Sequence, residues 1–166
     1  MNYGQIRKYD VANGTGIRTT IFVTGCTHNC RNCFNKEYQD FKAGNTWTEK
    51  ETKQVIKYLS DPNVKGLSLL GGEPFQNLWL IDIIKEIKPY LRENQDIWVW
   101  SGYTFEEIVS RKQRRELLSL CDILVDGKFI EELKDLKLKF RGSSNQRIIE
   151  ISKSLQENRP ILSDLN

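Results

Sequence analysis

The sequence predicts an α/β fold: an incomplete, open (β/α) TIM-like barrel with about four to six parallel strands. Short runs of apolar and β-branched residues alternate with segments of helical periodicity, which is the pattern of parallel βα units. A complete barrel of eight units takes on the order of 200 to 250 residues, whereas this chain has 166. The unusual motifs each follow a predicted strand, which is where parallel sheets place their chemistry.

Four runs predict strands, because each ends in a glycine or a polar turn residue. They cover residues 19–24, 66–70, 97–100 and 122–125. No repeat, low-complexity stretch or Pro/Gly/Ser-rich linker separates them. We therefore expect residues 1–166 to form a single domain, in which the tail beyond about residue 147 carries no predicted element.

Helices are predicted between these strands. Thr48 and Glu51 form a capping box at the start of the first helix, and Thr104 and Glu107 form another at the start of the third, which continues to residue 118. Pro89 should bend or end the second helix. The apolar residues expected to face the sheet are Val55, Ile56 and Leu59, then Leu80, Ile83, Ile84, Ile87 and Leu91, and finally Ile108, Leu117 and Leu118.

The composition argues against a dedicated nucleic-acid binder and against a membrane-spanning protein. The 25 basic and 22 acidic residues leave a net charge of +3, far from that of a dedicated nucleic-acid binder. The basic run at residues 111–115 is more typical of a solvated helix face than of a phosphate-binding patch. No run approaches the roughly 20 apolar residues that span a bilayer, and the N-terminus does not resemble a signal peptide. We expect a cytoplasmic protein with no nucleic-acid or membrane partner.

The cysteines fall into two groups. Cys26, Cys30 and Cys33 lie within eight residues, which is too local for a disulfide framework and typical of metal or cluster binding in a reducing cytosol. Cys121 stands in an apolar run and is expected to be a small core residue. The three clustered thiols therefore predict one metal centre.

Three interpretations of this loop are open: an iron–sulfur cluster, a zinc site and a redox switch. A cubane cluster bound by three cysteines keeps its fourth iron free for a substrate, and the missing fourth cysteine favours it. A structural zinc site could recruit His28 as a fourth ligand, although four ligands so close together would be cramped. A Cys30/Cys33 redox switch would leave Cys26 unexplained. We expect the cluster, with His28 as a hydrogen-bonding loop residue.

The spacing Cys26-x₃-Cys30-x₂-Cys33 resembles the signature of the radical S-adenosylmethionine superfamily. Further motifs narrow the resemblance to one family, the activating proteins of anaerobic ribonucleoside-triphosphate reductase, which are similar to pyruvate formate-lyase activating enzymes. Thr15, where the family usually has proline, departs from the pattern, and Asn32 replaces a frequent aromatic of the superfamily. The supporting segments are residues 1–3, 13–18, 71–74, 100–103, 125–129 and 141–146.

This resemblance implies the cofactors and the residues that bind them. Cys26, Cys30 and Cys33 would hold a 4Fe-4S cluster with catalytic and metal-binding roles, beside one S-adenosylmethionine. Carbonyls around Gly71 and Gly72 would accept from the ammonium group of S-adenosylmethionine, and Glu73 would orient that turn. The remaining cofactor-binding residues would be Asn32, Cys33, Phe34 beside the adenine, Ser101, Asp126 and Lys128. On the residues alone, Asp126 and Lys128 fit an ordinary Asp-Gly turn equally well.

The resemblance also implies an activity. Reductive cleavage of S-adenosylmethionine would yield a 5′-deoxyadenosyl radical that abstracts a hydrogen from one glycine of the reductase, leaving a glycyl radical. The implied partners are the glycyl-radical subunit of the reductase and a reduced flavodoxin-like electron donor. Two alternatives stay open at this point: a radical enzyme acting on a small molecule, and a zinc-stabilised interaction module.

Overall fold

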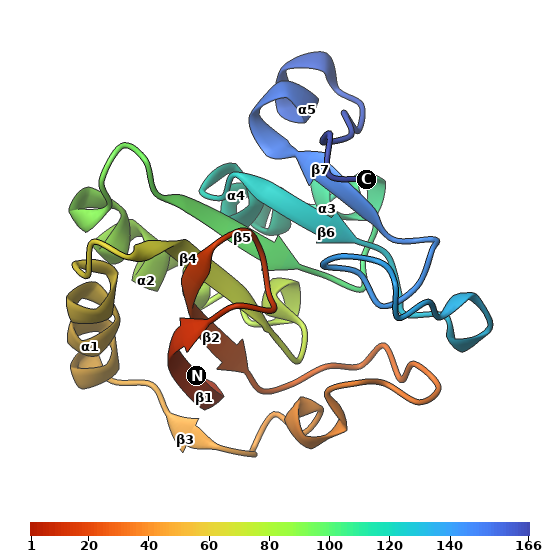
Figure 1. Ribbon diagram of the computed structural model, residues 1–166. Coiled ribbons are helices and arrows are strands. Elements are labelled where there is room, and N and C mark those ends of the chain that lie inside the picture. Colours follow the sequence, from red (N-terminus) through yellow and green to blue (C-terminus); the bar gives the residue numbers. More distant parts are fainter.

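A computed structural model describes all residues 1–166. It contains one seven-stranded sheet with the strand order β3-β1-β2-β4-β5-β6-β7 (Figure 1). The four predicted strands are its centre, and β2, β4, β5 and β6 run parallel to one another as expected. The strands are β1 (Asn2–Asp10), β2 (Ile17–Val23), β3 (Asn45–Thr46), β4 (Val64–Gly71), β5 (Asp96–Trp100), β6 (Ile123–Asp126) and β7 (Arg147–Glu150).

Three antiparallel strands were not predicted. β1 pairs with β2, β3 pairs with β1, and β7 pairs with β6, so the sheet is open with β3 and β7 at its edges. β1 is mostly polar and half-buried, so it lacks the apolar run that marked the central strands. β3 has two residues and β7 has four, which is too short for a period to be recognised.

The helices largely follow the prediction. Both capping boxes form, at Thr48 and at Thr104, and the second helix ends at a 3₁₀ turn that contains Pro89. The helices are α1 (Glu49–Leu59), α2 (Leu80–Ile87), α3 (Phe105–Val109), α4 (Lys112–Ser119) and α5 (Ile151–Glu157), with 3₁₀ turns η1 (Lys36–Tyr38), η2 (Pro74–Gln76), η3 (Lys88–Tyr90) and η4 (Glu131–Leu133). None of these helices has the length and apolarity needed to cross a bilayer.

One prediction about the helices was wrong: the third helix is two helices. α3 stops at Val109 because Ser110 Oγ donates to the Glu107 carbonyl oxygen at 2.7 Å, an alternative bond that competes with helix continuation. Arg111 then adopts an extended conformation before α4 begins. The basic run of residues 111–115 lies mostly on the exposed face of α4, as expected.

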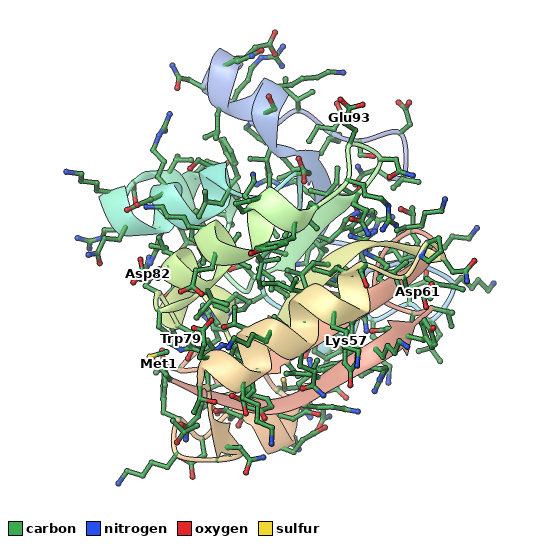
Figure 2. The ribbon with its side chains drawn as sticks, turned by 90° about the vertical axis from the view of Figure 1, so that its left-hand side faces the viewer. Met1, Lys57, Asp61, Trp79, Asp82 and Glu93 are labelled. Atoms are coloured by element: carbon green, nitrogen blue, oxygen red, sulfur yellow. The ribbon has the colours of Figure 1, made fainter.

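The main core lies between the helices and one face of the sheet. Figure 2 shows α1, α2 and α4 side by side in one layer over this face. The side chains of a strand alternate between the two faces, so Leu67 and Leu69 of β4 join the main core. Cys121 is 5% exposed and belongs to this core, as predicted.

The opposite face of the sheet leads to the site. Its side chains include Trp98, Val125 and Ile148, which form a separate small cluster. The last residues of this face on three parallel strands are Phe22, Leu70 and Trp100. They lie at the carboxyl ends of β2, β4 and β5 and line one cavity there.

Candidate active site

The cavity at the carboxyl ends of the parallel strands has a volume of about 550 Å³, within the range of small-molecule sites. Loops that follow β2, β4, β5 and β6 all contribute to its wall. Cys26, Cys30 and Cys33 are half-buried and line it together. The topology therefore brings the predicted thiols to the place where parallel α/β sheets carry their chemistry.

The cysteine loop leaves β2 and turns sharply. Asn29 and Asn32 have φ values of +55° and +53°, a left-handed conformation that asparagine tolerates better than most residues. Backbone N–H groups of Gly25 and Cys26 donate to the carbonyl oxygens of Tyr38 and Gln39 at 2.8 and 3.0 Å. These bonds fix the loop's first residues against the segment that closes it. In Figure 1 the loop is the orange segment that extends to the right of β2.

The Gly71-Gly72 turn packs directly against the start of this loop. A Cβ atom on Gly72 would lie 2.6 Å from the Gly25 carbonyl oxygen and 2.7 Å from that of Tyr38. Gly71 has a φ of +108°, which side-chain-bearing residues rarely adopt. Both glycines line the cavity, so bare backbone faces its interior. The glycines are therefore needed for the close approach of this turn to the cysteine loop.

Glu73 joins three of the loops around the cavity. It is 1% exposed, and its carboxylate accepts from Phe75 N at 2.9 Å and from Gly102 N at 2.7 Å. Ser101 Oγ lies 3.0 and 2.9 Å from its two oxygens. A 2.7 Å hydrogen bond joins Glu73 Oε1 to His28 Nε2 in the cysteine loop. The structure thus gives His28 the expected hydrogen-bonding role.

The surroundings of Cys26 and Cys30 raise the pKa of both thiols in the free chain. Burial raises the pKa of Cys26 to about 11, and the Glu73 carboxylate acts in the same direction. Burial also raises the pKa of Cys30, and the neighbouring Cys33 adds to the effect. At neutral pH these two thiols are protonated, so a positively charged centre that binds their thiolates must displace protons.

Three predicted cofactor-binding side chains do not line the cavity. Asp126 is 1% exposed, accepts from Phe105 N at 2.7 Å and is ion-paired with Arg147 at 2.6 Å. It therefore fixes the start of α3. Lys128 is exposed, and Asn32 donates to Glu131 at the surface. Phe34, Gly71, Gly72, Glu73 and Ser101 do line the cavity.

Sequence reasoning missed several residues of the cavity wall. Arg7 and Asn13 come from β1 and the turn after it, where no apolar run marks a strand. Arg141 and Gln146 lie in the segment 141–146 that carries part of the family resemblance, but neither was assigned a role. The Arg141 Nε atom is buried and has no hydrogen-bond partner, while Nη1 of the same side chain donates to the Gln146 carbonyl oxygen at 3.1 Å.

The donor set suits a cluster better than a single ion. No group of three or more His, Cys, Asp or Glu side chains gathers closely enough to hold one metal ion. In a cubane cluster each thiolate binds a different iron, so the sulfur atoms need not converge on one point. His28, the fourth ligand of the zinc alternative, is instead hydrogen-bonded to Glu73. Three thiols, bare glycine backbone and the Arg141 side chain on one cavity fit a cluster with a carboxylate-bearing cofactor beside it.

Comparisons with known proteins agree with this geometry. The model of the family described as "4Fe-4S single cluster domain" matches residues 12–149. The anaerobic ribonucleoside-triphosphate reductase-activating protein of Haemophilus influenzae is 43% identical over 152 residues, which are 89% of this chain and 97% of that protein. The protein of the same name from Pasteurella multocida is 41% identical over 89% of this chain and 96% of its own length.

A bacteriophage protein of the same name is also similar to this chain. The anaerobic ribonucleoside-triphosphate reductase-activating protein of Enterobacteria phage T4 is 38% identical over 151 residues, covering 89% of this chain and 93% of that protein. These alignments span nearly the whole length on both sides. The chain therefore belongs to the family of anaerobic ribonucleoside-triphosphate reductase-activating proteins and contains a 4Fe-4S single cluster domain.

Proposed function

We propose that this chain activates an anaerobic ribonucleoside-triphosphate reductase by generating a glycyl radical on it. The family relationship supports this activity. The observation that carries it is the common cavity: three thiols, the Gly71-Gly72 turn and Arg141 all line one space. When bound there, the cluster and S-adenosylmethionine would supply a reductively generated 5′-deoxyadenosyl radical that abstracts a glycine hydrogen.

Each part of the site then has a binding or positioning role. Cys26, Cys30 and Cys33 would hold the cluster, and carbonyl groups of Gly71 and Gly72 would accept from the ammonium group of S-adenosylmethionine. Phe34, which packs on Phe129 with ring centroids 4.7 Å apart and lines the cavity, would bind the adenine. Ser101 acts by holding Glu73.

The other three predicted cofactor-binding residues lie outside the cavity wall. Asp126 keeps the end of β6 and the start of α3 in place through its bonds to Phe105 N and Arg147. Lys128 and Asn32 are exposed next to the cavity loops and do not line the cavity, and Asn32 is bonded to Glu131. We therefore rank them below the glycine turn as cofactor-binding residues.

The architecture fits a protein substrate. We propose that the open sheet is an incomplete barrel whose missing units leave a lateral opening, wide enough for a glycine-bearing loop. The two free sheet edges, at β3 and β7, support this. A reduced flavodoxin-like protein is the electron donor that the resemblance implies.

The experiment that tests this function is electron paramagnetic resonance. The chain would be reconstituted anaerobically with iron and sulfide and mixed with S-adenosylmethionine, dithionite and the anaerobic reductase from the same source. A doublet radical signal on the reductase is the expected result. Formation of 5′-deoxyadenosine without that signal would point instead to a small-molecule substrate. Absence of both, with a full cluster present, would refute the assignment.

A ligand substitution gives the first prediction. Cys30→Ala should remove one of three cluster ligands and abolish cleavage of S-adenosylmethionine, while the sheet stays folded. The matched control is Cys121→Ala, in the main core and outside the cavity wall, which should lower stability but retain cleavage. Iron content, circular dichroism and 5′-deoxyadenosine formation measure the three effects. Cleavage retained by the Cys30 variant would remove Cys30 from the ligand set.

A further inference from the structure

The segment between η4 and β7 forms an ordered projection beside the cavity, which we call the strap (residues 133–144). Two backbone bonds close its base, from Asp135 N to Gly142 O at 3.3 Å and from Ser144 N to Leu133 O at 2.9 Å. Trp100 Nε1 donates to the Phe140 carbonyl oxygen at 2.8 Å and ties the strap to β5. In Figure 1 the strap lies in the light-blue segment that follows β6, on the same side as the orange cysteine loop.

The strap presents apolar side chains at the mouth of the cavity. Leu136 is 83% exposed and still belongs to the cavity wall, together with Leu138 and Phe140. Leu133 and Phe34 add further exposed apolar surface next to it. Apolar side chains gathered at the rim of a cavity are typical of a binding surface rather than of a free monomer face.

Lysines alternate with these apolar residues. The order from Lys134 is Lys-Asp-Leu-Lys-Leu-Lys-Phe-Arg, and Lys134, Lys137 and Lys139 are exposed. None of these three lysines takes part in a salt bridge within the chain. Lys134 lies over the Phe34 ring, 5.3 Å from its centroid, and three cations without an ion pair on one short projection favour a partner with acidic side chains.

We propose that the strap is the docking surface for the reductase, and that it binds an acidic, apolar segment of that protein next to the target glycine. This inference rests on the proposed function. The reductase is favoured over an electron donor because Leu136, Leu138 and Phe140 line the cavity itself, which the target glycine must enter. An electron donor needs only proximity to the cluster, without access to the cavity.

The test uses charge reversal on the full chain. The variant Lys137→Glu/Lys139→Glu changes two exposed side chains that do not line the cavity, so cluster content and S-adenosylmethionine affinity should stay unchanged. Its dissociation constant for the reductase, measured by calorimetry, should rise at least about tenfold. The matched control is Lys53→Glu/Lys57→Glu on α1, on the helix layer shown in Figure 2, which should bind the reductase like the wild type.

The outcomes separate the inference from the function on which it rests. A weakened reductase complex and a lower glycyl-radical yield with dithionite as reductant support docking on the strap. Unchanged reductase binding by the strap variant would overturn the inference, while wild-type radical formation still supported the proposed function. Loss of activity only with a protein electron donor would overturn it as well and assign the strap to that donor. Equal weakening in the α1 control would show a nonspecific charge effect and count against it.

Discussion

At the scale of single residues, His28 connects the two halves of the site. It lies between Cys26 and Cys30 in the chain, and its ring bonds Glu73 in the turn that follows β4. The ring also packs edge-on against Tyr103, with centroids 4.5 Å apart, and a Cβ on Gly102 would lie 2.5 Å from it. His28 is therefore a positioning residue that couples the cysteine loop to the glycine turn.

Replacing this residue gives the second prediction. His28→Phe keeps the ring but removes the bond to Glu73, so the glycine turn loses one of its supports. We expect the dissociation constant for S-adenosylmethionine to rise about tenfold, with iron content unchanged. His28→Gln, which retains a donor, should restore part of the affinity. Calorimetry and iron analysis distinguish a positioning role of His28 from a role as cluster ligand, because loss of a ligand would lower the iron content.

Asp10 shows how a buried carboxylate shapes the wall of the cavity. Burial alone raises the pKa of Asp10, but bonds from Asn13 at 2.7 Å, Ala12 N at 2.9 Å and Thr20 at 2.7 Å outweigh it and lower the pKa below 3.8. Ala12 and Asn13 line the cavity, so the ionised form of Asp10 holds this turn in place.

The third prediction follows from the sign of this shift. A carboxylate whose folded-state pKa is depressed stabilises the fold above its unfolded pKa, and the stabilisation disappears as pH falls through the folded pKa. Asp10→Asn should therefore lower the free energy of unfolding by about 1–3 kcal/mol at pH 7 and by less at pH 3. Urea titrations at both pH values measure the difference. The control is Asp164→Asn at an exposed position, where the two pH values should give the same change in the free energy of unfolding. If Asp10→Asn lowered that free energy equally at pH 7 and pH 3, the charge of Asp10 would not contribute to its stabilising effect.

At the scale of elements, the turn after β4 and the loop after β2 act as one unit. Gly72 N donates to Val23 O and Glu73 N donates to Gly25 O, both at 2.8 Å. The two elements approach so closely that only backbone separates them at Gly72. A change in one should therefore displace the other.

The fourth prediction tests this contact. Gly72→Ala would place a methyl group against the carbonyl oxygens of Gly25 and Tyr38, which belong to the backbone and yield little. We expect cluster content to fall and the free energy of unfolding to drop by about 1–3 kcal/mol. In Gly142→Ala the nearest atom belongs to the Phe34 side chain, which can rotate, so this control should retain the cluster. Equal iron content in both variants would show that the cysteine loop adjusts independently.

The elements also show what the sequence could and could not predict. The central strands and the capping boxes at Thr48 and Thr104 were predictable, because apolar runs and local capping bonds determine them. β1 was not, since its stability depends on pairing with β2 across the chain. The break at Ser110 depends on one side-chain bond that propensity does not encode.

The residues of the candidate site also fall into a group that the sequence could predict and a group that it could not. The cysteines and the glycine turn were predictable because their spacing and chemistry are local in the sequence. The place of Asp126 was not, because Arg147, 21 residues further on, competes for its carboxylate and holds it away from the cavity wall. Arg141 escaped assignment because only the folded strap brings its side chain to the cavity.

At the scale of the whole molecule, chemistry and stability lie at opposite ends of the parallel strands. The thiols and the glycine turn lie at the carboxyl ends, whereas Arg18 lies fully buried near the amino ends of β2, β4 and β5. Its guanidinium donates to Ser68 Oγ at 2.8 Å and to the carbonyl oxygens of Leu67 and Asp96, each at 3.0 Å. It also makes an ionic contact of 2.7 Å with the Asp96 carboxylate and faces the Trp98 ring.

The fifth prediction follows from this separation. Arg18→Met keeps most of the side-chain volume but leaves acceptors of two strands, β4 and β5, without this donor, so the free energy of unfolding should fall by about 3 kcal/mol or more. Arg159→Met, which breaks an exposed pair with Glu157, should change it by less than about 0.5 kcal/mol. Urea denaturation compares the two. Under conditions where the Arg18 variant is fully folded, its affinity for S-adenosylmethionine should match the wild type, because Arg18 does not line the cavity and reaches its wall only indirectly, through Ser68 Oγ, which donates to the Asn13 carbonyl oxygen at 2.7 Å. A weakened affinity in that folded protein would show instead that the sheet transmits distortion from its amino end to the site.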